Sequence, residues 1–534
     1  MVFNSFGFIF IFMPLLLAGY NLLLHFGYRR LAILFITAMS AVLYGMFNYK
    51  YLVIIGISMA VTYLFSYIIE KKSGGSSKSI SIKKESGSSS KSISIEKESG
   101  DSSKSISIEK ESGGSSNSIS IKKKVSPLIP AAAVMFHVAV LGYFKYTGFL
   151  VDNINSIFKT DYTFTAFLLP VGISFYTFSQ IAFVIDRYRG EIPHYDFLSY
   201  AFYILYFPKI MQGPIAFPKE IIDQTRDIES LRFDADRFGR GIILFIIGLA
   251  KKVLLADTIA LIVTYTYSQA YYLDTLCVIV AGIATALNIY FDFSGYCDMA
   301  DGISQMLGIT LPQNFNSPFK ASTVQELWQR WHMTLSRFLT KYIYFPLGGS
   351  RKGAARTIIN ILIIFFISGL WHGAGWTYVV WGLVNGILVI FDHFHKRKLL
   401  PVKIRQVLTF LFFSFSVIIF QASDLTTARV MIGKLSFFTY PGFLYRTAAN
   451  LTLSETYVLE EAVQLFAPNM LNIYYFVLML VVVIFSLFLM TRPNAREIAA
   501  RTTFKTWQIV ALSILACLSI LSLSNVQTFV YFTF

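Results

Sequence analysis

The sequence predicts an all-α, polytopic integral membrane protein that crosses the bilayer with about 11–13 membrane helices or re-entrant segments. Of its 534 residues, 55% are hydrophobic and only 14% are charged, and the mean hydropathy is +0.58. Aromatic residues make up 16% of the chain, which is typical of helices that face lipid and meet two membrane–water interfaces. Apolar runs long enough to span a bilayer recur along the chain. This composition excludes a single compact water-soluble domain.

The first apolar run, at about 6–24, is expected to be a retained helix, because no positive residue precedes it and no small-residue cleavage site follows it. Arg29 and Arg30 come directly after it. The positive-inside rule therefore places this loop in the cytoplasm and the N-terminus outside. Runs at 31–47 and 51–70 then return the chain to the cytoplasmic side.

Residues 73–124 differ from the rest, because they are four tandem copies of a 13-residue unit rich in Ser, Gly, Lys and Glu. A unit with two isoleucines buries almost nothing, so we expect a disordered cytoplasmic loop. A duplicated spacer is favoured over an interaction module. The chain then divides into N-terminal membrane helices at 1–72, this repeat insertion at 73–124, and a membrane core at 125–534 that the helices at 1–72 complete.

Ten further apolar runs follow the insertion. Within them, the 197–218 stretch contains Pro208, Gly213, Pro214 and Pro218, which disfavours one regular helix and predicts a broken segment buried in protein or lining a cavity. The more polar 421–470 stretch is expected to be a loop with short helices. The runs lie at about 128–149, 163–185, 197–212, 241–266, 273–293, 357–371, 376–392, 405–421, 470–491 and 506–524.

The formal net charge of +16 raises the question of nucleic-acid binding. Lys and Arg fall in short loops between apolar runs rather than along one solvated face, so membrane topology accounts for the charge and no nucleic-acid partner is expected. Cys277, Cys297 and Cys517 form no C-x-x-C pair. We therefore expect no metal site and no disulfide framework.

Residues 324–345 are too charged to span a membrane but are strongly periodic. Their apolar positions predict one face of a helix lying at an interface. A neighbouring polar face carries His332, and Glu326 and Arg330 are spaced for an i,i+4 ion pair. His332 is a candidate functional residue, with a packed or solvated histidine as the alternative, and Arg330 is a candidate orienting or structural residue. The apolar positions are Trp328, Trp331, Leu335, Phe338 and Tyr342.

His372 lies in the apolar run IIFFISGLWHGAGWTYVVWG. An ionisable side chain is costly there and by default faces a cavity or the bundle interior. Gly369, Gly373 and Gly375 surround it, so we expect an interrupted helix whose backbone can approach a bound group. The alternative is a neutral imidazole that packs two helices together.

Asp292, Asp298 and Asp301 follow an apolar span, within LNIYFDFSGYCDMADG. Carboxylates there can orient an imidazole or bind a cation, and an aspartate at a helix boundary is commonly a cap. We expect an orienting or structural role. Asp186 and Arg187 are expected to form an ion pair at the end of another span.

The chain contains no Walker loop, nucleophile elbow, dinucleotide fingerprint or H-E-x-x-H motif. The remaining chemistry is a histidine that acts as a base or acid inside the membrane, on a substrate whose reactive group is brought there.

Six collinear stretches resemble a known family, the membrane-bound O-acyltransferases, and within it the AlgI-like alginate and peptidoglycan O-acetylation group. The resemblance covers nearly the whole chain outside 73–124 and 421–470. The stretches are MVFNSFGFIFIFMPLLL, PVGISFYTFSQIAFVIDRYRGE, FPKIMQGPI, IYFDFSGYCDMADGISQMLGITLPQNFNSPF, WQRWHMTLSRFLTKYIYFPLGGSRKG and SGLWHGAGWTYVVWGL, followed by an aromatic FVYFTF end.

The resemblance implies a bacterial inner-membrane O-acetyltransferase. It places the family's two functional histidines on His372, as the catalytic base, and His332, which would hold the donor or complete the proton path. It also implies acetyl-CoA as the acyl donor, no permanently bound cofactor, a periplasmic esterase-like partner, and an extracytoplasmic polysaccharide acceptor.

Two other functions remain open from the sequence. A teichoic-acid D-alanyl transferase of the same superfamily would take its acyl group from a carrier protein. A polysaccharide or ion transporter would also have many spans and intramembrane polar residues, but it is expected to show two related halves, and the histidine motifs each occur once.

Overall fold

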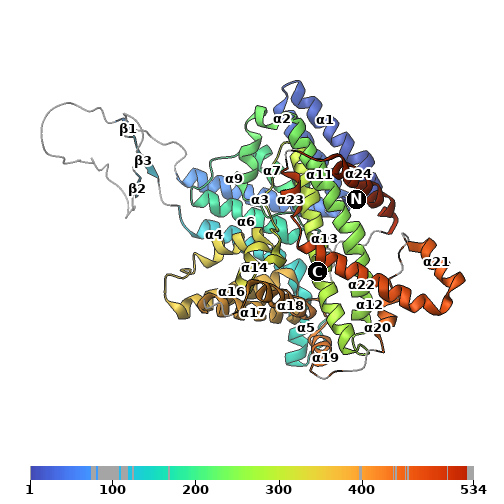
Figure 1. Cartoon of the computed structure of the whole chain (residues 1–534). Coiled ribbons are helices and arrows are strands. Elements are labelled where there is room, and N and C mark those ends of the chain that lie inside the picture. Colours follow the sequence, from blue (N-terminus) through green and yellow to red (C-terminus); the bar gives the residue numbers. More distant parts are fainter. Residues whose placement is uncertain are drawn as a thin grey trace.

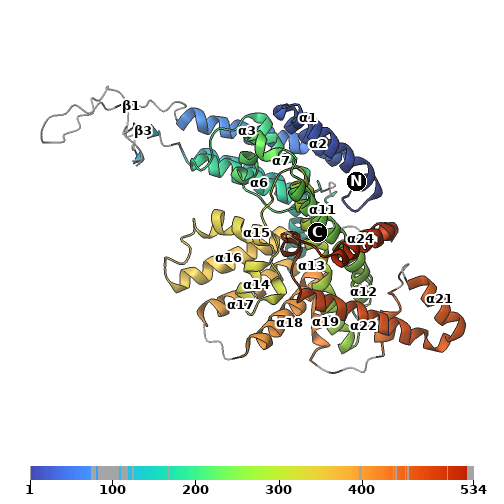
Figure 2. The same ribbon diagram turned by 45° about the horizontal axis from the view of Figure 1, so that its top comes forward.

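The computed structural model describes residues 2–73, 80–81, 107–109, 118–122, 125–165, 169–395, 400–436, 438, 442–451, 453, 456–501 and 503–525. Its long elements are all helices, stacked around one long central helix, α13 (Figures 1 and 2). The all-α prediction is confirmed.

The first half of the chain forms thirteen numbered α-helices in the described residues. A π-helical turn at Phe8–Phe12 (η1) precedes α1, others at Gly142–Tyr146 (η2) and Lys251–Ala256 (η4) join successive helices, and Asp223–Thr225 is a 3-10 turn. The α-helices are α1 (Met13–His25), α2 (Arg29–Gly45), α3 (Tyr49–Ser73), α4 (Leu128–Leu141), α5 (Thr147–Phe158), α6 (Ile173–Tyr188), α7 (Phe197–Leu205), α8 (Phe207–Ile210), α9 (Pro218–Ile222), α10 (Ile228–Leu231), α11 (Ala235–Ala250), α12 (Asp257–Ser268) and α13 (Thr275–Met306).

The second half adds α14 (Val324–Arg330), α15 (Met333–Leu339), α16 (Ala354–His372), α17 (Trp376–Phe394), α18 (Val402–Gln421), α19 (Leu425–Gly433), α20 (Leu444–Ala448), α21 (Tyr457–Phe466), α22 (Leu471–Met490), α23 (Ala495–Ala499) and α24 (Thr506–Leu521). A π-turn at Thr340–Tyr344 (η6) follows α15, and 3-10 turns lie at Pro318–Lys320, Pro468–Met470 and Ser522–Asn525.

Eight of the described helices are long and apolar enough to cross a membrane. Of the other predicted runs, α2 and α24 are helices of 17 and 16 residues, α6 begins only at Ile173, and α11 to α12 form one helical path interrupted by η4. The eight are Phe8–His25, Tyr49–Ser73, Leu128–Phe158, Thr275–Met306, Ala354–His372, Trp376–Phe394, Val402–Gln421 and Pro468–Met490.

The predicted repeat insertion lies outside the described residues, apart from three short strands. These are β1 (Ile80–Ser81), β2 (Ser107–Glu109) and β3 (Ser118–Lys122). Both β1 and β2 pair with β3 antiparallel, with Ile80 opposite Ile119 and Ile108 opposite Ile121. The interpretation of this segment as a disordered spacer stays a prediction.

Helix α13 is the centre of the fold, because 78% of its apolar stretch is buried, against 39% or less in every other spanning helix. Four glycines let α11 approach it closely. A Cβ added to Gly241 or Gly248 would lie 2.6 Å from the backbone oxygen of Gly302 or Gly295, respectively. Small residues at such crossings allow backbone-to-backbone packing inside a membrane, where no hydrophobic drive between helices is available.

The 197–218 stretch is broken and buried, as predicted. Helix α8 ends at Ile210, and the chain then continues without regular structure to α9. Gly172, which has a φ of +72°, packs so closely on this segment that a Cβ would collide with the carbonyl oxygen of Ile210. The segment thus lies against the turn that begins α6. The short helices predicted within 421–470 are also confirmed, as α19, α20 and α21.

Candidate active site

His332 lies at a break between two short helices. The prediction of one interfacial helix over 324–345 is wrong, because α14 ends at Arg330 and α15 begins at Met333. His332 has a φ of +44°, a left-handed conformation that is costly for a residue with a side chain. Its side chain and those of Trp328 and Trp331 are buried, not interfacial.

Asn314 holds the backbone and the ring of His332 in this strained turn. The N–H of Met333 donates to the carbonyl of Asn314 at 2.9 Å. The Asn314 side-chain oxygen accepts hydrogen bonds from the Thr334 hydroxyl at 2.8 Å and the Thr334 N–H at 3.3 Å. These donors identify the acceptor atom as oxygen rather than nitrogen. The strain of the turn is therefore offset by a specific set of hydrogen bonds.

The same oxygen of Asn314 lies 3.1 Å from Nδ1 of His332. Since an amide oxygen can only accept, Nδ1 carries the proton, and Nε2 is the atom that can accept one. Burial lowers the pKa of His332 below its usual value. The imidazole is therefore neutral at physiological pH, as a base requires.

His372 is the last residue of α16, so the predicted interruption of this helix is confirmed. Helix α16 packs closely on α17, since a Cβ at Gly369 would collide with the carbonyl oxygen of Tyr378 and one at Gly382 with that of Phe365. The position after His372 must also be a glycine, because a side chain at Gly373 would overlap the Tyr378 ring. The turn that presents His372 is thus fixed by backbone contacts.

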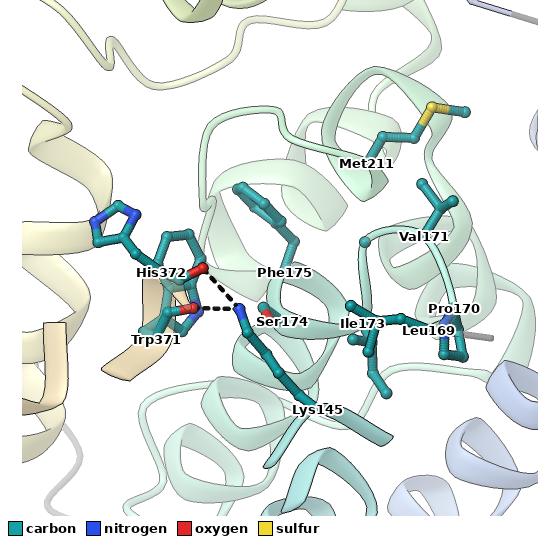
Figure 3. A pocket seen from close by; sticks show the side chains of 11 residues that line it. Lys145, Leu169, Pro170, Val171, Ile173, Ser174, Phe175, Met211, Trp371 and His372 are labelled. Atoms are coloured by element: carbon teal, nitrogen blue, oxygen red, sulfur yellow. Dashed lines mark hydrogen bonds between the residues drawn. The ribbon is translucent and has the colours of Figure 1, made fainter. Parts of the chain in front are cut away.

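The carbonyl end of α16 receives hydrogen bonds from η2. Nζ of Lys145 donates to the carbonyls of Trp371 at 2.6 Å and His372 at 3.0 Å, and the Tyr146 hydroxyl donates to Leu370 at 2.7 Å. The last carbonyls of a helix have no partner within it, and a cation also matches the negative end of its dipole. Figure 3 shows Lys145 reaching both carbonyls.

The structure brings the two histidines together from positions 40 residues apart, with ring centroids 6.2 Å from each other. Aromatic rings surround them. Trp371 lies near both imidazoles, at 5.6 Å from His332 and 4.9 Å from His372, and Phe293 and Trp381 complete the enclosure at 4.8 and 5.3 Å. Such a shell keeps water away from the pair.

A cavity of about 80 Å³ borders the backbone of His372. Its walls are Lys145, the 169–175 turn, Met211 from the broken segment, and Trp371. In Figure 3 the carbonyl of His372 faces Lys145, while its imidazole points away from Ser174 and Leu169. The cavity therefore reaches the site from the side opposite the imidazole.

Asp292, Asp298 and Asp301 lie inside α13 rather than at a helix boundary, so none of them caps a helix. Asp292 pairs with Lys252 at 2.7 Å, Asp298 with Lys251 at 2.6 Å, and Asp301 with Arg496 at 2.8 Å. These ion pairs fasten α13 to η4 and to α23.

Arg330 forms the expected ion pair with Glu326 at 3.0 Å and also donates to the carbonyl of Asn316 at 3.3 Å. It thereby ties α14 to the loop that carries Asn314. The predicted pairing of Asp186 with Arg187 is wrong, because Arg187 pairs with Glu70 at 3.4 Å. Asp186 instead binds Lys341 and Tyr342 of η6.

Comparison with known proteins agrees with the resemblance to the membrane-bound O-acyltransferases. Residues 187–426, which contain both histidines, match the model of MBOAT, the membrane-bound O-acyltransferase family. The chain is 35% identical over 333 residues to a peptidoglycan O-acetyltransferase of Helicobacter pylori, an alignment covering 56% of this chain and 63% of the relative.

It is also 36% identical over 318 residues to a probable alginate O-acetylase AlgI of Pseudomonas aeruginosa, covering 58% of this chain and 60% of the relative. A teichoic acid D-alanyltransferase of Bacillus subtilis is more distant, at 27% identity over 272 residues, covering 47% of this chain and 68% of the relative. The chain spans less than two thirds of the length of the first two relatives. Residues 187–426 therefore resemble the membrane-bound O-acyltransferase family, and the part of the chain that the structure describes contains eight helices long and apolar enough to cross a membrane.

Proposed function

We propose that this protein is an O-acetyltransferase that moves an acetyl group from cytoplasmic acetyl-CoA towards hydroxyl groups of an extracytoplasmic polysaccharide, either alginate-like or peptidoglycan. The observation that carries the proposal is the meeting of His332 and His372 in one aromatic enclosure, inside the region that matches the family. The names of the two more similar relatives support acetyl as the transferred group. A periplasmic esterase-like partner would complete the transfer to the polymer.

His372 acts as the general base in this proposal. It takes the proton from the acceptor hydroxyl while that oxygen attacks the thioester carbonyl. The C–S bond then breaks, the thiolate leaves and takes up a proton, and the acetyl ester remains on the acceptor. His332, with its proton fixed on Nδ1 by Asn314, presents Nε2 to hold the donor or complete the proton path.

The surroundings support this division of roles. Lys145 and Tyr146 fix the end of α16, so the His372 imidazole keeps one position relative to its substrates. The aromatic enclosure excludes water, which protects the thioester from hydrolysis and strengthens the dipoles around the reacting carbonyl.

The test of donor identity compares acetyl-CoA with a D-alanyl carrier protein. Purified protein should release free thiol from acetyl-CoA when a hydroxyl acceptor is present, and should leave the charged carrier protein intact. Transfer from the carrier alone would support the D-alanyl transferase and reject the acetyltransferase. Substrate flux across vesicles that persists when both histidines are replaced would support a transporter instead.

Asn314→Leu is expected to lower the turnover rate about 100-fold or more, because His332 loses the acceptor that fixes its tautomer and the turn loses its support. Asn314→Asp keeps an oxygen in the same place and should restore most of the rate. The measurement is kcat for both variants at equal amounts of folded protein. Equal loss in both variants would reject a role for this oxygen in positioning the imidazole.

We further propose that the loop after α1 is cytoplasmic. Arg29 donates to the carbonyl of Thr225 at 3.5 Å, and Glu70 accepts from His194 at 2.6 Å. Arg30 also pairs with Asp196 at 3.8 Å, two residues from His194. The loop after α1 and the end of α3 therefore lie on the same face as the loop between α6 and α7, and the positive-inside rule assigns that face to the cytoplasm.

This orientation is tested with two exposed tyrosines that flank α2, Tyr28 and Tyr49, in a Cys517→Ser background. A membrane-impermeant thiol reagent applied to whole cells should label Tyr49→Cys and not Tyr28→Cys. Labelling in the opposite sense would reverse the assigned orientation.

A further inference from the structure

A second cavity, of about 340 Å³, lies among α11, η4, α13, α22, α23 and α24. In Figures 1 and 2, α24 and α22 flank the same side of α11 and α13. Apolar side chains make up most of the wall. They include Ile247, Leu254, Phe485, Leu489, Leu512 and Leu515.

This crevice opens towards lipid. Only 17% of the apolar stretch of α22 is buried, and outward side chains of both bordering helices are exposed, such as Phe488 on α22 and Ile514 on α24. In a protein that spans a bilayer, exposed apolar faces of this kind are covered by acyl chains.

One end of the crevice is polar and cationic. Arg492 and Asn494 line it, and the Arg492 guanidinium sits 4.1 Å from the centre of the Phe488 ring. Nζ of Lys320 donates to the carbonyl of Arg492 at 2.9 Å. Among the residues that the structure describes, no carboxylate pairs with either cation, whereas the nearby Lys251 and Arg496 each bind an aspartate.

The polar end also lies next to a pocket that reaches the support of His332. Lys251, Tyr290 and Asn494 line both the crevice and a smaller pocket of about 20 Å³. That pocket is lined by Asn314, the residue that binds Nδ1 of His332. The crevice is separate from the candidate active site, but it adjoins the pocket lined by Asn314, which supports His332.

We propose that this crevice binds an anionic glycerophospholipid. One acyl chain lies between α22 and α24 against α11, and the phosphate faces Arg492 and Lys320. The apolar wall accounts for the chain and the two cations account for the charge, because phosphate pairs strongly with Arg and Lys at the membrane surface. A zwitterionic lipid places its acyl chain against the same wall, but it binds more weakly because its headgroup carries no net negative charge.

The test measures thermal unfolding of the purified full-length protein as phosphatidylglycerol or phosphatidylcholine of identical chains is added, with native mass spectrometry to count bound lipids. The wild type should bind phosphatidylglycerol roughly 10- to 30-fold more tightly than phosphatidylcholine, as expected for two cations near the phosphate. The double variant Arg492→Gln/Lys320→Gln should lose this preference. Arg501→Gln, which removes an exposed charge from the loop after α23 but does not line the crevice, should keep it.

A second pair of variants tests the acyl-chain wall. Leu515→Trp narrows the crevice and should reduce binding of both lipids, whereas Ile514→Trp, on the outer face of the same helix, should bind as the wild type does. Glycerol phosphate without acyl chains should neither bind nor displace the lipid. Equal binding of the two lipids by the wild type, equal effects of Arg501→Gln and the double variant, or displacement by glycerol phosphate would each overturn the proposal.

Discussion

Replacing Lys252 by methionine is expected to leave little stably folded protein. Lys252 is 1% exposed, and its Nζ lies 2.8 Å from Asp257 and 2.7 Å from Asp292, whose side chains are 7% and 1% exposed. Removing the cation leaves two buried carboxylates next to each other, and breaking a buried pair in this way costs about 3–5 kcal/mol. The measurement is the yield of monodisperse protein and its thermal midpoint in detergent.

Two further variants show whether uncompensated charge is the cause. Neutralising both carboxylates as well, in Lys252→Met/Asp257→Asn/Asp292→Asn, should recover part of the stability. Lys251→Met should cost less than Lys252→Met, because it leaves one carboxylate, Asp298, which is more exposed at 16%. A Lys252→Met protein as stable as the wild type would contradict this account of the α13 ion pairs.

The spanning helices could be predicted from the sequence because an apolar run long enough to cross a bilayer is a local property of the chain. The break in the 197–218 segment is local as well, since Pro208 and Pro214 act on their own backbone. The interruption of the helix at His372 could also be predicted from the sequence, because three glycines surround this residue.

The turn at His332 could not be predicted, because its cause is distant in the chain. Periodicity in 324–345 favours one continuous helix, but the loop at Asn314 binds Met333, Thr334 and the imidazole itself. That set of hydrogen bonds overrides the local preference. Nothing in the residues around Asn314 indicates a histidine as its partner.

The partners of buried charges were also beyond prediction from the sequence. The three aspartates of α13 find cations 40, 47 and 195 positions away, and no local spacing encodes such distances. Lys145 could be singled out from the sequence, because it is an isolated cation in a predicted span. Such residues mark functional or structural contacts. Its role at the end of α16 became apparent only in the structure.

Replacing His372 by glutamine is expected to lower acetyl transfer about 100- to 10,000-fold while the protein still folds. Glutamine retains hydrogen-bonding capacity but cannot take a proton near neutral pH. His372→Ala should be as inactive. If the imidazole only packed against Trp371, Trp381 and Phe420, glutamine would preserve activity and alanine would lower the amount of folded protein.

The matched control is His137→Gln. His137 is another histidine buried in a spanning helix, but it binds Thr62 of α3 at 2.8 Å in a polar cluster between α3, α4 and α6. Its replacement should lower stability and leave the rate per folded molecule near that of the wild type. A rate loss equal to that of His372→Gln would show that any buried histidine is needed for a general structural reason.

The most direct measurement follows radiolabelled acetyl groups from acetyl-CoA to a hydroxyl acceptor in proteoliposomes containing the wild type, His372→Gln or His137→Gln, with bound acetyl-CoA and folded protein quantified in each. The wild type and His137→Gln should transfer label in proportion to folded protein, and His372→Gln should bind acetyl-CoA without transferring it. A folded His372→Gln protein that transfers label at the wild-type rate would contradict the assignment of His372 as the base.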